Sequence, residues 1–229
     1  RARPEKDEAP PGFGPAKAAI ENEAPQRIIT IGGNCLVSQA PFDHLHGLYP
    51  NSGILWLDAH PDVSMPEDGY PNAHAMVLGA LLGAGEPSMA GLTKNPAFKP
   101  DELLYVGLQG LHDYQAKFLD NLGVNYKVQT ENFVSDDDIR AFVQKFDHVL
   151  VHLDIDVLDP LYFHSTYFAN PNLVGDGSGG GRMTMDQLAS ILHLVAANSE
   201  IAGLTIAEYL PFDEERLHKL FGSLKLFTD

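Results

Sequence analysis

The sequence contains one cysteine, Cys35, among its 229 residues. A single cysteine cannot form a disulfide within the chain, so a secreted scaffold held together by disulfides is excluded. No apolar run approaches the ~18 residues that a membrane-spanning helix needs, and the N-terminus lacks a signal-peptide pattern. We therefore expect a protein of the reducing cytoplasm.

Basic residues are scarce as well. The 15 lysines and arginines face 31 aspartates and glutamates, which gives a net charge of −16. Nucleic acid is bound by clustered basic side chains that meet its phosphates, and an anionic membrane surface also attracts basic segments. The charge therefore disfavours both partners, and part of the acidity is expected to serve a bound cation.

Apolar runs of strand length alternate with amphipathic segments of helix length. The predicted strands are 27–33, 53–59, 102–108, 124–129, 148–158 and 201–210; the predicted helices are 37–48, 73–84, 113–122, 135–146, 184–197 and one that starts near Asp213. The strands are almost continuously hydrophobic, as expected where helices cover both faces of a parallel sheet. We predict an α/β fold of three layers, α/β/α, around a central, mainly parallel sheet.

Residues 1–25 are rich in proline, alanine and charge, and they are predicted to form a polar leader or connector. Residues 26–229 are predicted to form a single α/β domain; whether a further strand precedes it is left open. Polar clusters, "GGNC", "DAHPD", "DIDVLD" and "AEYLP", follow four of the strands. Ligands of open parallel sheets gather at the carboxyl ends of the strands. The site is therefore expected at that edge, with the glycine-rich residues 175–181 as one of its loops.

The cluster "DAHPD" contains Asp58, His60 and Asp62, which are spaced by two. An extended backbone points such residues to one side. Carboxylate and imidazole groups suit a divalent metal such as Mn²⁺, Zn²⁺ or Co²⁺. The alternative is an aspartate that caps the next helix beside a surface histidine.

The segment "HLDIDVLDP" repeats the spacing with Asp154 and Asp156, at the end of an apolar run. Burying unpaired carboxylates costs several kcal/mol, so a buried pair favours a bound cation. The two clusters together supply four carboxylates and one imidazole, enough to hold two cations roughly 3.5–4 Å apart. Asp159, before Pro160, is predicted to form a turn outside the site.

Six segments, "GGN", "DAHPD", "NAHAMVLGALLG", "HLDIDVLDP", "GGRMTMDQL" and "AEYLPFD", resemble in order the signature blocks of the ureohydrolase family, which includes arginase, agmatinase and formimidoylglutamase. The resemblance runs from about residue 29 to the last helix. It implies the arginase-like α/β fold, a homo-oligomer and a place in arginine metabolism. It also implies hydrolysis of a linear C–N bond in a guanidino or formimino substrate, by hydroxide that bridges two Mn²⁺, for which Zn²⁺ or Co²⁺ could substitute.

The resemblance assigns the metal ligands residue by residue. Asp58 and Asp154 resemble the carboxylates that bridge the two metals. His60 and Asp156 resemble ligands of one metal, and Asp62 resembles a ligand of the other.

The resemblance also assigns two catalytic residues. His74 matches the histidine that shuttles a proton, and Glu208 matches the carboxylate that holds the guanidinium group. A glutamate at a strand end is well placed to face a cationic substrate through a charge-assisted hydrogen bond. The alternatives are a histidine on a helix surface and a glutamate that caps a helix or lies on the surface.

One departure from the family pattern concerns the metal. The family presents Asp-His after its paired glycines, whereas this chain has Asn34 and Cys35. Cys35 could be a metal ligand, could leave that metal weakly held, or could be a small buried residue. Because a thiolate suits Mn²⁺ poorly, we expect the manganese beside Asp62 to be the weaker of the two.

Other departures concern the substrate. Asn72 matches a substrate-contacting asparagine, but the bulky Tyr70 lies just before it and is a candidate for selecting the substrate's tail. Asp113 is a candidate for contact with an amino group. These changes make a related guanidino compound, such as N-hydroxyarginine, at least as well matched as arginine.

Two other functions compete with this one. A metal-poor, non-catalytic partner or regulatory protein is favoured by the change at Asn34 and Cys35. A deacetylase-type zinc amidohydrolase would bind a single metal, which the paired aspartates disfavour. The other histidines are interpreted mostly as surface or edge residues: His44, His46, His112, His148, His152, His164, His193 and His218.

Overall fold

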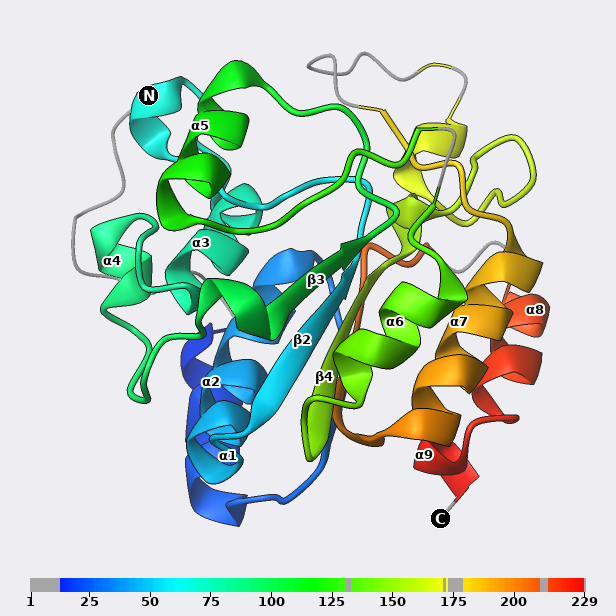
Figure 1. The fold of residues 1–229 in the computed structure, drawn as a ribbon, viewed down its shortest axis with the longest axis horizontal. Helices are drawn as coiled ribbons and strands as arrows, with labels where there is room; N and C mark the ends of the chain where they lie inside the picture. Colours follow the sequence, from blue (N-terminus) through cyan, green and yellow to red (C-terminus); the bar gives the residue numbers. More distant parts are fainter. Residues whose placement is uncertain (1–12, 131–132, 171, 173–178, 211–213, 229) are drawn as a thin grey trace.

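The computed structural model describes residues 13–130, 133–170, 172, 179–210 and 214–228. Its centre is a five-stranded sheet in the order β1-β5-β4-β2-β3, with every neighbouring pair parallel (Figure 1). The strands are β1 Ile28–Ile31, β2 Ser52–Leu57, β3 Leu103–Val106, β4 His148–Asp154 and β5 Glu200–Ala207. The predicted α/β fold with a parallel sheet is confirmed.

Helices cover both faces of the sheet (Figure 1). One face carries α2 Gln39–Leu48, α3 Val77–Leu81, α4 Pro87–Ala90 and α5 Asp113–Leu122, with α1 Phe13–Glu23 packed beside α2. The other carries α6 Asp136–Val143, α7 Met185–Asn198, α8 Glu214–Phe221 and α9 Lys225–Thr228. Short 3₁₀ helices are η1 Cys35–Ser38, η2 Pro66–Asp68, η3 Ala73–Met76, η4 Pro100–Glu102, η5 Ile155–Val157 and η6 Tyr167–Ala169.

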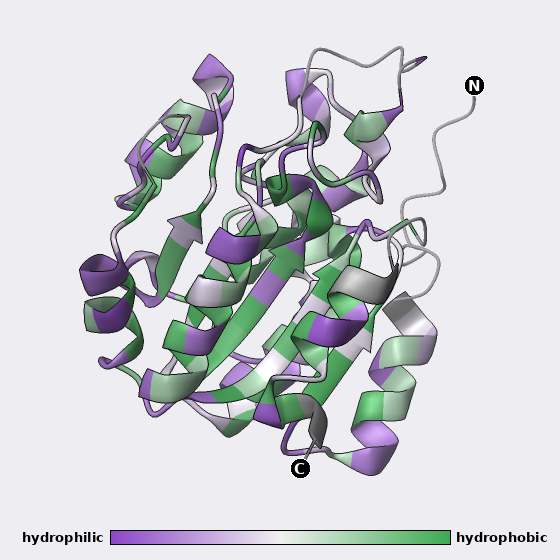
Figure 2. Ribbon diagram, turned by 90° about the vertical axis from the view of Figure 1, so that its right-hand side faces the viewer, coloured by the Kyte–Doolittle hydropathy of each residue, from purple (hydrophilic) through white to green (hydrophobic). Residues whose placement is uncertain are grey.

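The alternation of side chains along the strands produces two hydrophobic cores. On β2, Ile54 and Trp56 pack with the core under α2 and α3, whereas Leu55 and Leu57 pack with the core under α6 and α7. All six residues of β2 are buried, as expected for a strand covered on both faces. In Figure 2 the strands are mostly green and the helices carry purple segments, which is the pattern of a sheet shielded by amphipathic helices.

The strand predicted at 124–129 is wrong. These residues are irregular, and β3 forms the edge of the sheet. The buried side-chain amide of Gln129 forms hydrogen bonds with backbone groups that a further strand would otherwise have paired. Its Oε1 accepts hydrogen bonds from the backbone of Gly107 (3.0 Å) and Val134 (3.1 Å), and its Nε2 donates to the carbonyl of Tyr105 (3.1 Å).

Other boundaries also differ from the predictions. The predicted strand at 148–158 ends at Asp154, where the chain turns into η5, and the helix predicted at 73–84 is divided between η3 and α3. The segment predicted as a polar leader contains α1, whose residues 14–23 are exposed or half-buried. Among the described helices, none has the length and apolar character to cross a membrane.

Candidate metal centre and substrate cavity

The six predicted metal ligands converge where β2 and β4 end. Three sets of ligand atoms each lie within 4.8 Å of one another. These sets are Cys35, Asp58, Asp62 and His152; Asp58, His60 and Asp156; and Cys35, Asp154 and Glu208. Four aspartates are almost fully buried in this cluster, with exposed fractions of 0% to 3% for Asp58, Asp62, Asp154 and Asp156.

Each of the two central aspartates is fixed by the turn that follows its strand. Asp58 Oδ1 accepts a hydrogen bond from the backbone of His60 (2.7 Å), and Oδ2 accepts one from Trp56 Nε1 (3.0 Å). Asp154 Oδ1 accepts from the backbone of Asp156 (2.8 Å), and Oδ2 accepts from Cys35 Sγ (3.0 Å). The spacing of two therefore gives each aspartate a local cap as well as a place in the cluster.

His60 and Asp156 connect the two strand ends. His60 Nδ1 lies 2.9 Å from Asp156 Oδ2 and 3.6 Å from Asp58 Oδ1. The other oxygen of Asp156 accepts a hydrogen bond from the backbone of Ala59 (3.3 Å). These contacts place an imidazole nitrogen between two carboxylates.

Two candidate residues have left-handed backbone conformations, which are uncommon outside glycine. Asp62 has a φ of 49°, and its carbonyl accepts hydrogen bonds from Leu78 and Gly79 at the start of α3. Glu208 has a φ of 58°, and its backbone N–H donates to the carbonyl of Gly33 (2.6 Å). Such strain persists where surrounding contacts enforce it, and it gathers at functional sites.

The buried carboxylates repel one another. Burial and the charges of Asp156, Asp58 and Glu208 raise the pKa of Asp154 well above its usual range. Burial and Asp58 likewise raise the pKa of Asp62. Burial opposes ionisation of Asp58 too, but contacts with His152 and His60 hold its pKa below the usual value. A cation in the cluster would relieve this repulsion.

The residues present fit divalent cations. Three buried atoms of the ligand-set residues, His60 Nε2, Asp62 Oδ2 and His152 Nε2, have no hydrogen-bond partner among the described residues. Buried polar atoms are almost always paired, and both kinds of atom are common metal ligands. Burial and four acidic neighbours, Asp62 first, also raise the pKa of the Cys35 thiol, so a cation would be needed to hold it as a thiolate.

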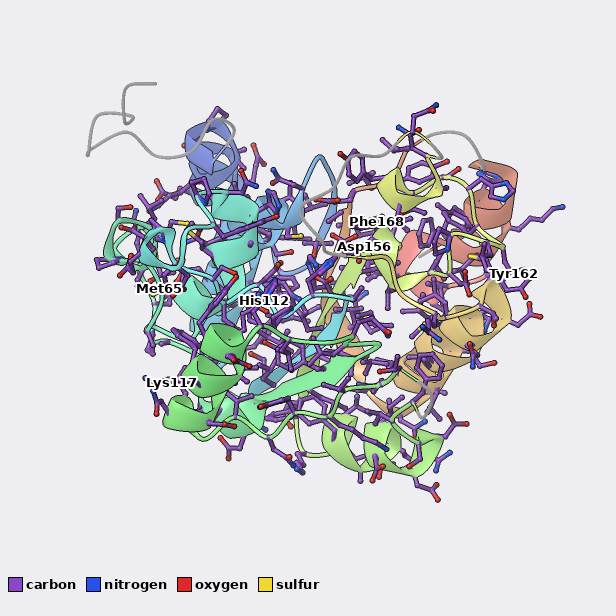
Figure 3. All side chains as sticks on the ribbon, turned by 90° about the horizontal axis from the view of Figure 1, so that it is seen from above. Met65, His112, Lys117, Asp156, Tyr162 and Phe168 are labelled. Atoms are coloured by element: carbon purple, nitrogen blue, oxygen red, sulfur yellow. The ribbon has the colours of Figure 1, made fainter. Side chains whose placement is uncertain are left out.

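A cavity of about 720 Å³ opens above the cluster. Its lining includes the cluster residues Cys35, His60, Asp62, Asp154 and Asp156, and the predicted catalytic and substrate residues His74, Glu208, Asn72 and Tyr70. Figure 3 looks onto this end of the molecule, where Asp156, Phe168 and His112 lie nearer the middle than Met65 or Tyr162. The ring of Tyr70 meets that of His74 edge-on, with centroids 6.3 Å apart.

Asp113 does not line the cavity. It is the exposed first residue of α5, and the preceding residue, His112, lines the cavity instead. Of the glycine-rich segment 175–181, Gly179 and Gly180 line the cavity, whereas 175–178 lie outside the described residues.

A family model described as Arginase family matches residues 16–220. The chain belongs to the arginase family. It is 25% identical over 219 residues to an arginase of Staphylococcus aureus (strain MRSA252), an alignment that covers 91% of this chain and 68% of that relative. It is 28% identical over 140 residues to the arginase of Bacillus caldovelox, which covers 58% of this chain and 47% of that relative.

Solved arginase structures share the fold. The native structure of Bacillus caldovelox arginase matches with a TM-score of 0.75 at 23% identity, over 94% of this chain and 74% of that one. Entamoeba histolytica arginase in complex with L-ornithine matches with a TM-score of 0.71 at 21% identity, over 91% of this chain and 73% of that one. The chain thus spans only part of the length of the arginases that it resembles.

In this arginase-family chain, sequence reasoning missed His152. It was expected at the surface or an edge, but it is completely buried on β4. The spacing in the sequence indicates its position: His152 lies two residues before Asp154, and residues two apart on a strand share a face of the sheet. Other cavity residues, such as Gln109, Tyr114 and Phe168, lie in or beside loops that carry no repeating pattern.

We expect the metal-free protein to lose stability as the pH rises. Burial and the charges of Asp156 and Asp58 raise the pKa of Glu208 from 4.5 to about 7. The folded state therefore binds this proton more tightly than the unfolded state, and the stabilisation present below about pH 4.5 is lost as the pH passes about 7. Each tenfold change in proton affinity is worth about 1.4 kcal/mol, so the free energy of unfolding should fall by about 3 kcal/mol.

Thermal unfolding in the presence of a chelator, at about pH 5 and about pH 8, tests this expectation. The raised pKa values of Asp62, Asp154, Asp156 and His60 act in the same direction, whereas Asp58 titrates below this range. Saturating manganese serves as the control, because bound cations should reverse the trend. A metal-free protein that is equally or more stable at about pH 8 would contradict the electrostatic description.

Proposed function

We propose that the protein hydrolyses a linear C–N bond in a guanidino or formimino substrate, using two bound divalent cations, for which manganese is the leading candidate. The observation that carries the proposal is the convergence of Asp58, His60, Asp62, Asp154 and Asp156 in one cluster, whose last four members line a single cavity. Membership of the arginase family supports the same type of hydrolase. When bound, a pair of divalent cations supplies the activated nucleophile that such a hydrolysis needs at neutral pH.

The protein's own residues would bind and orient the substrate. Glu208 lines the cavity beside the cluster, on a backbone anchored to Gly33. Its carboxylate would accept charge-assisted hydrogen bonds from the guanidinium group and hold the reacting carbon over the cluster. A bound guanidinium would also favour the ionised form of Glu208, because an opposite charge lowers the pKa of a carboxyl group.

The substrate's tail is proposed to extend towards Tyr70 and Asn72, which line the cavity with His74. Asn72 supplies an amide that can donate or accept, and Tyr70 presents a half-buried ring. The sequence between these residues departs from the family pattern, so we include N-hydroxyarginine and other guanidino compounds beside arginine as candidate substrates.

A screen of guanidino and formimino compounds tests the proposal directly. The manganese-loaded chain is incubated with each compound, and the release of urea, hydroxyurea or ammonia is measured together with the metal content. We expect release from at least one compound and a metal content near two per chain. A metal content well below two with no release from any compound would favour the metal-poor, non-catalytic alternative, and full metal content with no release would contradict the proposed hydrolysis.

His74→Ala is expected to slow turnover by about a hundredfold while the metal content stays unchanged. His74 is half-buried, lines the cavity and belongs to none of the three ligand sets, so its imidazole can pass a proton to the departing amine. General acids contribute factors of about a hundred to ten thousand. Steady-state kinetics across pH provide the measurement, and the variant should lose one limb of the wild-type profile. An unchanged pH profile would remove His74 from the proton path.

A further inference from the structure

His152 is a buried histidine for which the proposed reaction has no role. It lies on β4 with no exposed surface, and its ring stacks on Trp56 with centroids 3.6 Å apart and planes 11° apart. Its Nδ1 lies 2.6 Å from Ser38 Oγ, which in turn lies 2.6 Å from Thr205 Oγ1. The ring is therefore held on one face by an indole and at one nitrogen by a hydroxyl pair.

The other ring nitrogen, Nε2, faces Asp58 in the cluster. His152 Nε2 is buried without a hydrogen bond among the described residues, and its nearest acidic atom is Asp58 Oδ2, 3.6 Å away. The hydroxyl pair can accept the Nδ1 proton, which leaves the lone pair on Nε2. A lone pair that faces a carboxylate is unfavourable unless a cation lies between them. Histidines that bind metals are oriented in this way, with the second nitrogen donating to a neighbouring oxygen.

The atoms around Nε2 form a mixed ligand set. Ligand atoms of Cys35, Asp58, Asp62 and His152 lie within 4.8 Å of one another, and all four residues are buried. One oxygen of Asp62 also has no hydrogen-bond partner among the described residues. A thiolate, an imidazole and two carboxylates match the four-coordinate preference of zinc, whereas manganese prefers harder oxygen ligands.

The second position has a different character. Asp58, His60 and Asp156 offer two carboxylates and one imidazole, without sulfur. The family pattern has an imidazole where this chain has Cys35. This chain provides another imidazole from β4, that of His152, which approaches Asp58 Oδ2, whereas His60 approaches Asp58 Oδ1. The histidine that the family has at position 35 and the added His152 therefore belong to the same metal position, the one formed with Asp58 and Asp62.

We propose that Cys35, Asp58, Asp62 and His152 form a zinc-preferring position, so that the centre holds zinc beside manganese rather than two equivalent manganese ions. The Cys35 thiol, which donates to Asp154 Oδ2, would release its proton to solvent as zinc binds. This inference rests on the proposed metal centre but not on any particular substrate.

Binding of cobalt in place of zinc tests whether Cys35 is a metal ligand, without any measurement of turnover. The full chain is stripped of metal and titrated with Co²⁺, and the near-ultraviolet absorption band of a cobalt–thiolate bond is recorded. We expect this band in the wild type and its loss in Cys35→Ser. Cobalt bound to the wild type without the band would overturn the inference while leaving the proposed function intact, and a wild type that binds no metal would overturn both.

His152→Asn tests whether His152, like Cys35, is a ligand of the proposed zinc position. Asparagine can keep the contact with Ser38 but lacks an atom at the position of Nε2, so zinc affinity should fall by about a hundredfold or more. His148→Asn, at the other end of β4, is the matched control and should leave zinc affinity unchanged. Circular dichroism checks the fold, and His152→Gln, which can retain a polar atom near Nε2, should recover part of the affinity. Wild-type zinc affinity in folded His152→Asn would remove His152 from the site.

Discussion

Asp154→Asn is expected to reduce turnover by about a thousandfold, the equivalent of about 4 kcal/mol, and to lower the metal content below two per chain. Asp154 is buried to 1% exposure at the end of β4. Asparagine preserves the shape of the side chain and can still accept the hydrogen bond from the backbone of Asp156. The substitution therefore removes a negative charge from the cluster while the turn is kept.

The same variant should be more stable than the wild type when metal is absent. Burial and three acidic neighbours raise the pKa of Asp154, so its ionised form destabilises the metal-free protein at neutral pH. Thermal unfolding with and without manganese measures both effects, and mass spectrometry of the metals gives the stoichiometry. We expect a higher melting temperature without metal and a smaller rise when manganese is added.

Asp159→Asn is the matched control for Asp154→Asn. Asp159 lies five residues further along, and its carboxylate accepts a hydrogen bond from the backbone of Leu161 (2.8 Å). It belongs to none of the three ligand sets, so the control should keep the wild-type metal content and turnover. Two bound metals and normal turnover in Asp154→Asn would contradict the proposed role of this carboxylate.

The sequence was sufficient to predict the parallel sheet and the edge at which the candidate residues meet, because both follow from short-range periodicity. Continuous apolar runs predicted buried strands, and residues spaced by two, such as Asp58 with His60 and Asp154 with Asp156, predicted groups on one side of the chain. Parallel strands place their carboxyl ends at one edge, and the two clusters do meet there.

The predictions that proved wrong concern residues whose positions depend on contacts between distant parts of the chain. Residues 124–129 have the composition of a strand, but they do not pair with β3. The side chain of Gln129 instead forms hydrogen bonds with the backbone of Tyr105 and Gly107, at the edge of the sheet. The surface or edge position predicted for His152 is wrong, and its stacking on Trp56 and its contact with Ser38 show why it is buried. Such pairings become visible only when the register of β2 and β4 is known.

Glu208→Gln is expected to lower kcat/KM by about a hundredfold to a thousandfold while both metals stay bound. Removing one partner of a charged, partly buried hydrogen-bonded pair costs about 2–5 kcal/mol, and the loss here is the charge that meets the substrate cation. Glutamine can keep the backbone of Glu208, because the anchor to Gly33 is a main-chain hydrogen bond. Kinetics with a cationic guanidino substrate and metal analysis of the same sample provide the measurement.

Glu208→Gln has a second, independent consequence for the metal-free protein. Because the raised pKa of Glu208, about 7, contributes to the loss of stability between about pH 5 and about pH 8, an amide that does not titrate should make that loss smaller by about 3 kcal/mol. Glu200→Gln is the control, since Glu200 lies at the opposite end of β5 in an exposed ion pair with Arg27 (2.8 Å). That control should keep both the kinetics and the metal content of the wild type. If Glu208→Gln instead lost its metals and its activity together, Glu208 would support the metal centre rather than bind the substrate.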